Sequence, residues 1–301
     1  NSTASYTVSL LHPKIIRDMR LIDQGYKVIE RPVSNFLPLP DDQYLILGGG
    51  IARTQAEFAK FSPRDADALP AYYASLETVA NVIRDLVLTC PPNVGDGMTM
   101  MLDALRQGRH IAALTIEQQR DVLDLFTKSA RGFLDSWFES DPVKAAFGFD
   151  AVVGNYASPD TPGSAYVLLH HVFGEVNGKK GAWGHVVGGM GSITQAMARV
   201  VQAMGVEVSL EAPVARVLVD GDKAVGVRLE GGEEVMAKRV IANVGPRLLY
   251  ERMMEPDDLP ADFVKRIKGF RTGSGTFRMN VALSALPDFR CLPGEGAHHQ
   301  S

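Results

Sequence analysis

The side chains most able to do chemistry in this 301-residue sequence gather just before a glycine-rich turn. They are Tyr166, His170, His171, Trp183 and His185. A metal site is disfavoured, because adjacent histidines in a strand point to opposite faces and neither H-E-x-x-H nor C-x-x-C occurs. A nucleophilic triad is also disfavoured, since no serine occupies a nucleophile elbow. The group therefore indicates binding by stacking and hydrogen bonding.

Two interpretations of this group are open. In one, all five side chains face a single cavity adjoining the glycine turn, because aromatic walls with a few polar groups are typical of sites for organic molecules. Tandem histidines in a strand diverge, so we expect only one of them to reach the cavity, and we expect it to be His171. In the other interpretation, one histidine is buried and hydrogen-bonded in the core while its neighbour is solvated.

The glycine turn at residues 188–191, Gly-Gly-Met-Gly, opens an expected helix. Ser192 followed by Gln195 has the spacing of a capping box, and apolar residues recur at helical spacing over 193–204. Gly205 is a suitable end, because a left-handed conformation costs glycine little. The turn either directs backbone amides at an anion and lets a planar ring approach, or it simply feeds the helix. On the pattern alone, the second interpretation is the simpler one.

Short strands follow this helix. Turns at 220–222 and 231–232 divide residues 213–237 into an antiparallel meander. The run 240–244 is nearly all apolar, which is typical of a strand buried in a parallel sheet. We expect residues 186–210, with a strand at 206–210, and residues 238–246 to share one parallel sheet, with the 213–237 meander packed on one face.

A second sheet is expected from two separate regions. Strand patterns occur within residues 27–47, with a tight turn at Asp41-Asp42, and again at 276–283. We expect both regions to contribute to one mixed sheet. With the helices, these strands place the chain in the α/β (α+β) class.

Residues 51–150 have mostly helical patterns. Ser62-Pro63 starts one helix, because serine caps the first turn and proline is suited to its first position. Pro70 predicts a break or kink in that helix, since proline removes a backbone donor. Thr115 with Gln118 predicts a capping box at another helix start.

Composition excludes several classes of function. A net charge of −4 and a pI near 6.0 give no electrostatic footprint for nucleic acid. The two cysteines, Cys90 and Cys291, fit no metal or redox pattern, so we expect a cytoplasmic or other reducing compartment. No apolar run approaches the roughly 20 residues of a bilayer span, which leaves peripheral membrane contact open. The oligomeric state is also open.

Several longer motifs resemble one family. They are residues 11–18 (LHPKIIRD), 61–67 (FSPRDAD), 165–171 (AYVLLHH), 181–184 (GAWG), 188–191 (GGMG) and 240–243 (VIAN). Together they resemble the phytoene desaturase-like, FAD-dependent oxidoreductases, which use a meander as the crossover of a parallel sheet. Within that family the likeness is greatest to the subgroup named after a pyridine nucleotide-disulfide oxidoreductase domain.

The resemblance implies a fold of the two-dinucleotide-binding type, FAD as cofactor, and hydride transfer from a small, apolar organic substrate to the flavin. The positions that match the family's cofactor contacts are Gly188, Gly189, Met190, Val214 and Asn243. The five aromatic and histidine side chains become candidate pocket residues beside the flavin. The resemblance assigns no catalytic acid or base, because the protein contributes orientation and a dry cavity to hydride transfer.

The resemblance also implies a division of the chain. We expect residues 1–23 to adjoin the dinucleotide-binding motif and 24–185 to form a substrate domain with a helical insertion at 51–150. Residues 186–246 would belong to the FAD-binding domain, and 247–301 would return to the substrate domain.

One feature of the family is absent from the sequence. The family opens with a G-x-G-x-x-G turn that holds the flavin pyrophosphate, and no such motif occurs in these 301 residues. We therefore expect the chain to be the middle of a longer flavoprotein and, on its own, to bind flavin weakly or not at all. Two alternatives remain: a non-catalytic binding or scaffold module without flavin, and an amine-oxidase-type flavoenzyme.

Overall fold

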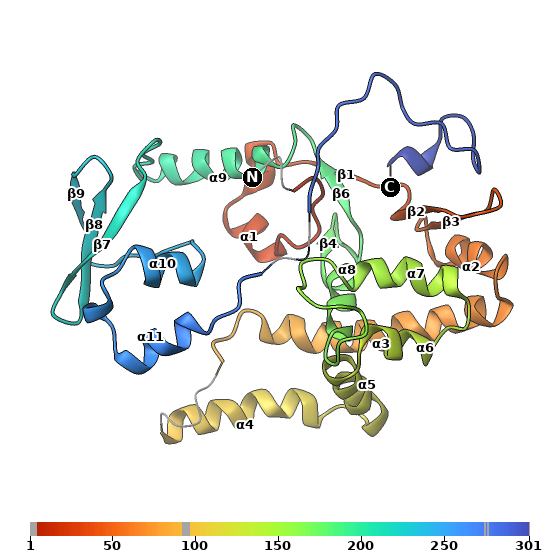
Figure 1. The fold of residues 1–301 in the computed structure, drawn as a ribbon, viewed down its shortest axis with the longest axis horizontal. Coiled ribbons are helices and arrows are strands. Elements are labelled where there is room, and N and C mark those ends of the chain that lie inside the picture. The colour runs from red at the N-terminus through yellow and green to blue at the C-terminus, as the bar shows by residue number, and fades with distance from the viewer. Residues whose placement is uncertain (1–4, 92–96, 274, 276, 301) are drawn as a thin grey trace. The chain divides into compact units, whose positions relative to one another are not determined.

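In the computed structural model, residues 5–91, 97–273, 275 and 277–300 are described, and the chain divides into two compact units (Figure 1). The larger unit comprises Asn1–Val201 and Gly275–Ser301, and the smaller comprises Gln202–Ser274. Each unit has its own arrangement of helices and strands.

The larger unit is mainly helical. Its helices are α1 (Pro13–Asp18), η1 (Leu21–Gln24), α2 (Ile51–Ala59), α3 (Pro63–Leu86), α4 (Met98–Ala112), α5 (Ile116–Thr127), α6 (Ala130–Asp135), α7 (Asp141–Asp150), η3 (Ala165–Leu169), α8 (His170–Phe173), most of α9 (Gly191–Ala203) and η5 (Ala297–Gln300). The starts of two helices follow the predicted rules. Ser62 accepts a hydrogen bond from the backbone of Asp65 at 3.1 Å, and Thr115 with Gln118 forms the capping box.

Helix α3 runs through Pro70 as one continuous helix, so the break that Pro70 predicts is not formed. Proline cannot donate to the carbonyl of Ala66, four residues earlier. The side-chain amide of Gln55, in α2, donates to that carbonyl instead, at 2.9 Å. A neighbouring helix thus supplies the hydrogen bond that proline removes.

The core of the larger unit centres on Tyr72 of α3. Its ring lies 4.8 Å from that of Phe147 and 4.9 Å from that of Phe138, between ring centroids. Phe58 of α2 contacts the same two rings, and all four side chains are buried. Aromatic pairs in such tilted and edge-on arrangements add to the stability gained from burial.

Short strand pairings complete the larger unit. Strand β1 (Val28–Glu30) pairs antiparallel with β6 (Gly184–Val186), and Val8 forms a bridge to Gly184. Two further pairs are hairpins, of β2 (Asn35–Pro38) with β3 (Tyr44–Leu47) and of β4 (Glu175–Val176) with β5 (Lys179–Lys180). The tight turn expected at Asp41-Asp42 is confirmed, since both residues have φ of 57°.

Helix α9 follows the glycine turn as expected, and Gly205 follows its end with φ of 85°. The cap at its start differs from the prediction. The Ser192 hydroxyl donates to the carbonyls of Val187 and Gly189, at 3.0 and 2.7 Å. It therefore holds the turn together, because the helix already starts at Gly191 and Ser192 lies inside its first turn.

The smaller unit contains the predicted meander. Strands β7 (Val214–Asp220), β8 (Lys223–Leu229) and β9 (Glu234–Met236) form one antiparallel sheet in that order. Three helical segments follow, α10 (Pro246–Arg252), η4 (Pro256–Asp258) and α11 (Ala261–Lys268), with interruptions near Pro256 and Pro260 as expected. The backbone of Val217 donates to that of Met253 at 2.8 Å, which joins the sheet to the end of α10.

Three expected strands are not formed. In the described residues, 206–210, 240–244 and 277–283 make no strand ladder, and Ile241 is 95% exposed. The expected parallel sheet is therefore absent from these residues, and so is the mixed sheet joining 27–47 to 276–283, because β1 pairs with β6 instead. An apolar run predicts a buried strand only where a neighbouring strand can satisfy its backbone groups.

Candidate functional site

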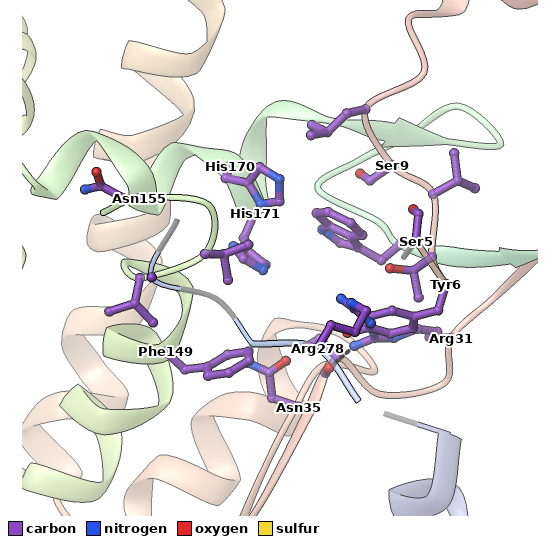
Figure 2. A pocket seen from close by; sticks show the side chains of 18 of the residues that line it. Ser5, Tyr6, Ser9, Arg31, Asn35, Phe149, Asn155, His170, His171 and Arg278 are labelled. Atoms are coloured by element: carbon purple, nitrogen blue, oxygen red, sulfur yellow. Dashed lines mark hydrogen bonds between the residues drawn. The ribbon is translucent and has the colours of Figure 1, made fainter. Parts of the chain in front are cut away.

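The candidate site is a cavity of about 1320 Å³ in the larger unit (Figure 2). Its walls come from segments far apart in the sequence, within residues 5–11, 31–37, 149–158, 170–193 and, near the C-terminus, 275 and 277–278. The β1–β6 pair and the bridge from Val8 to Gly184 hold the first two of these segments beside Trp183. The cavity is therefore formed by contacts between segments that are distant in sequence, and not by one sequence motif.

Three of the five predicted pocket residues meet at this cavity: His170, His171 and Trp183. The two imidazole centroids lie 4.9 Å apart, and the indole lies 5.2 Å from His170 and 5.3 Å from His171. Both histidines line the cavity, so the expectation that only one would reach it is wrong. The reason is local structure: they open helix α8, where neighbouring side chains diverge by about 100° and not by the 180° of a strand.

Tyr166 and His185 do not line the cavity. Tyr166 is exposed, and its ring stacks on that of Phe126 with centroids 6.0 Å apart. His185 belongs to β6, and its Nδ1 lies 3.3 Å from the backbone oxygen of Tyr6. Both side chains therefore have contacts within the protein and away from the cavity.

Asp150, at the end of α7, lies behind His171 and was not anticipated from the sequence. Its Oδ1 is 3.2 Å from Nε2 of His171, and the residue is only 6% exposed. Burial raises the pKa of Asp150 to about 7, although a hydrogen bond from Asn35 and the charge of Arg31 act in the opposite direction. Neither Asn35 nor Arg31 is near Asp150 in sequence, so no local pattern identifies this carboxyl.

Both histidines are neutral near pH 7. Burial, together with electrostatic repulsion from His170 and Arg31, lowers the pKa of His171 to about 3. Burial also lowers the pKa of His170. Each neutral imidazole therefore has one donor and one acceptor nitrogen. Nε2 of His171 lies beside Asp150, which leaves Nδ1 of that ring for a bound molecule.

Several buried polar atoms around the cavity have no hydrogen-bond partner in the described part of the chain. They are His170 Nδ1, His171 Nδ1, Trp183 Nε1 and Asp150 Oδ1. Buried polar atoms are normally paired, because an unpaired one costs about 1–3 kcal/mol. Their concentration here fits a ligand that carries hydrogen-bonding atoms. No group of side chains in the described ranges could hold a metal ion.

Arg31 is the second residue that the sequence did not single out. Its backbone donates to the carbonyl of Trp183 at 3.0 Å, immediately after β1. Its guanidinium donates to the carbonyl of Val33 at 3.4 Å and to that of Ser34. Burial lowers the pKa of Arg31, although it remains charged, since its ordinary pKa is above 12. A fixed cation therefore lines the cavity.

The glycine turn adjoins the cavity through Met190, which lines it together with Ile193 of α9. Gly188 and Gly189 have φ of 83° and 80°, a left-handed conformation that glycine adopts at little cost. A side chain added to Gly189 would meet no atom within 4 Å, so a flat molecule has room to approach. Val214 and Asn243 belong to the smaller unit, so the five expected cofactor contacts are divided between the two units.

Comparison with known proteins identifies the family. The family described as flavin containing amine oxidoreductase matches residues 29–276. Pyridine nucleotide-disulfide oxidoreductase domain-containing protein 2 of Rattus norvegicus is 35% identical over 99% of this chain and 55% of its own length. The subgroup expected from the motifs is thereby confirmed. The zeta-carotene-forming phytoene desaturase of Myxococcus xanthus is 37% identical over 49% of this chain and 27% of its own length.

Among solved structures, a putrescine oxidase triple mutant matches with a TM-score of 0.51. The match covers 86% of this chain and 51% of that one, at 18% identity, and shows a shared fold. The chain spans about half the length of the rat relative, 55%. In the described residues, no helix combines the length and apolarity needed to cross a bilayer.

Proposed function

The chain belongs to the family of flavin containing amine oxidoreductases. On this premise we propose that it functions in an FAD-dependent oxidoreductase. The reaction is the removal of a hydride from an organic substrate with a largely apolar body. The relative described as a phytoene desaturase supports this assignment over a reaction on amines.

The cavity beside the glycine turn is the observation that carries this proposal. Its lining combines Trp183 and two neutral imidazoles with Met190 and with apolar residues such as Val152 and Val153. Aromatic and apolar walls with a few oriented polar groups are typical of sites for organic molecules.

The residues present fit a flavin ring. Gly189 leaves space at the turn, and the unpaired nitrogens of Trp183, His170 and His171 match a flat heterocycle with donors and acceptors on its edge. A flavin bound there supplies the hydride acceptor. Gly188, Gly189 and Met190, with Val214 and Asn243 of the smaller unit, are the proposed contacts to the cofactor.

The protein itself orients the substrate and holds a proton on a buried carboxyl group. Trp183 and the imidazoles position the substrate and exclude water from it. The carboxyl of Asp150 titrates near pH 7, so it can hold a proton within 3.2 Å of Nε2 of His171. Among the described residues, no aspartate or glutamate lines the cavity.

The finer architecture is part of the same proposal. The meander of the smaller unit would act as the crossover of a two-dinucleotide-binding fold, and the helical larger unit would supply the substrate domain. Cys90 and Cys291 are both free, which fits work in a reducing compartment.

The test uses the complete product of the gene that encodes this chain. We expect the purified protein to show the visible absorption of oxidised flavin, and anaerobic addition of an apolar polyene to bleach it. A colourless protein that gains no flavin on incubation with FAD would support the non-catalytic module instead. Bleaching by alkylamines and not by polyenes would support the amine-oxidase alternative.

A further inference from the structure

The lining of the cavity carries an unbalanced positive charge. Arg31 and Arg278 both line it, and no aspartate or glutamate does among the described residues. This contrasts with the whole sequence, whose net charge is −4. We propose that the cavity takes a substrate whose apolar body ends in a carboxylate, and that Arg31 holds this carboxylate; the inference rests on the proposed function.

Arg31 is built to receive an anion. Within the described residues, no carboxylate lies within 4.0 Å of its guanidinium, which instead donates to the carbonyls of Val33 and Ser34. These carbonyls fix the plane of the group without neutralising it. A guanidinium has five N–H donors, so others remain for a ligand, and its planar fork matches a carboxylate.

The charge of Arg31 is compensated only in part by Asp150. Asp150 is close enough to act on Arg31 electrostatically but makes no ion pair with it. With a pKa of about 7, its carboxyl is partly protonated under neutral conditions. A net positive potential therefore remains in the cavity.

A second guanidinium lies at the same end of the cavity. Arg278 lies over the ring of Tyr6, 4.8 Å from its centroid, and Tyr6 hydrogen-bonds to Arg31. Figure 2 shows Tyr6, Arg31 and Arg278 gathered on one side, with His170 and His171 on the other. The cavity thus has a cationic end and an end with neutral, aromatic and apolar groups.

This polarity selects among substrate classes. A pure hydrocarbon would bury the guanidinium of Arg31 without a counter-ion, which is unfavourable. An ammonium group would be repelled by two like charges. An amphiphile with a polyene or alkyl body and a terminal carboxylate satisfies both ends, because its body lies along residues such as Phe149, Val152 and Val153.

The experiment measures binding by the purified 301-residue chain, without turnover. All-trans-retinoate and methyl retinoate share one polyene body and differ in the charge of the head group. Quenching of tryptophan fluorescence reports binding, since Trp183 lines the cavity. We expect retinoate to bind at least about tenfold more tightly than the ester, the contribution of one charge-assisted pair. Equal affinities would overturn the proposal.

Variants locate the effect. Arg31→Gln should reduce retinoate affinity to that of the ester, and Arg31→Lys should restore only part of it, because lysine lacks the planar fork. Arg120→Gln is the matched control, since Arg120 is an exposed arginine of α5 outside the lining, and it should change nothing. If Arg31→Gln fails to fold by circular dichroism, Arg278→Gln and the salt dependence of retinoate binding decide the question. The proposal is supported if retinoate binds more weakly to Arg278→Gln and also more weakly at high salt. It is overturned if neither change alters retinoate affinity.

The anion could instead belong to the cofactor, so FMN and inorganic phosphate are added as competitors. Displacement of retinoate by either, at concentrations near its own, would assign Arg31 to a phosphate and overturn the proposal. A chain that binds retinoate as expected while the complete gene product lacks flavin would contradict the proposed function and leave the carboxylate site standing. If polyenes bleach the flavin but retinoate is not preferred, the proposed function stands and the carboxylate site is contradicted.

Discussion

The two ends of helix α7 each meet a buried aspartate, and the two carboxylates have opposite surroundings. Asp65, at its start, accepts hydrogen bonds from the backbones of Glu139 and Ser140, both at 2.9 Å. Asp150, at its end, lies beside His171, and its Oδ1 has no hydrogen-bond partner among the described residues. Burial is therefore common to structural and candidate functional acids. The difference lies in whether the protein itself satisfies the buried charge.

Removing the satisfied carboxylate should have the largest effect on stability. We expect Asp65→Ala to lower the free energy of unfolding by about 4 kcal/mol, because it leaves two backbone donors buried and unpaired. Asp65→Asn should cost about half as much, since the amide keeps one acceptor. Urea unfolding monitored by circular dichroism measures both. A cost below about 1 kcal/mol for Asp65→Ala would contradict the contrast with Asp150.

Asp150→Asn should stabilise the protein, and only above acidic pH. The folded-state pKa of Asp150 is about 7 against an ordinary value of 3.8, so the folded protein retains a proton that the unfolded chain has released. Wild-type stability should therefore fall as the pH rises from about 4 to about 7, whereas the variant lacks this loss. We expect a difference of about 2 kcal/mol, since local relaxation absorbs part of the full effect. Unfolding at about pH 5 and about pH 8 gives the measurement, and a pH-independent difference would refute it.

The two tryptophans allow the same comparison with aromatic side chains. Trp137 packs on Tyr72 of the helical core with ring centroids 5.8 Å apart, whereas Trp183 lines the cavity. Trp137→Ala should lower the free energy of unfolding by about 2 kcal/mol. Trp183→Ala should cost about 1 kcal/mol or less, yet reduce turnover of the flavin-loaded enzyme far more than its flavin content. If flavin and stability are lost together while turnover per flavin stays normal, Trp183 is a core residue.

The smallest effect concerns the carbonyl of Ala66. Gln55→Ala should lower the free energy of unfolding by about 1 kcal/mol, because it leaves this buried acceptor unpaired. In a Pro70→Ala background the cost should disappear, since the introduced alanine would supply the missing backbone donor. A double-mutant cycle measures the coupling. Additive effects would show that Gln55 acts elsewhere.

Local rules predicted the parts of the fold that local contacts determine. The caps at Ser62 and Thr115, the Asp41-Asp42 turn and the meander each depend on residues close in sequence, and all four are present. The break expected at Pro70 is not formed, because the compensating hydrogen bond comes from Gln55, on another helix. The strands expected at 206–210 and 240–244 failed for a related reason, because an apolar run carries no information about its pairing partner.

In the candidate site, too, features that depend on nearby residues could be predicted, and features that depend on distant residues could not. The cluster of histidines with Trp183 was visible because aromatic residues concentrate in one stretch. Its geometry was not, since the pattern fitted a strand or a short helix, and the helix that forms brings both imidazoles to the cavity. Asp150 and Arg31 could not be found from sequence, because their importance depends on burial and on neighbours that the fold brings from elsewhere.

The missing side chain at Gly184 has a mechanical consequence for the cavity wall. Gly184 pairs with Glu30 of β1 and also exchanges backbone hydrogen bonds with Val8, at 2.9 and 3.0 Å. A Cβ atom there would lie 2.4 Å from a methyl of Val28 and 2.6 Å from the carbonyl of Ile29. Gly184 therefore joins the segment that carries Tyr6 to the segment that carries Arg31. Any side chain at residue 184 would force these two segments apart. It would thereby loosen the cationic end of the cavity without contacting a ligand.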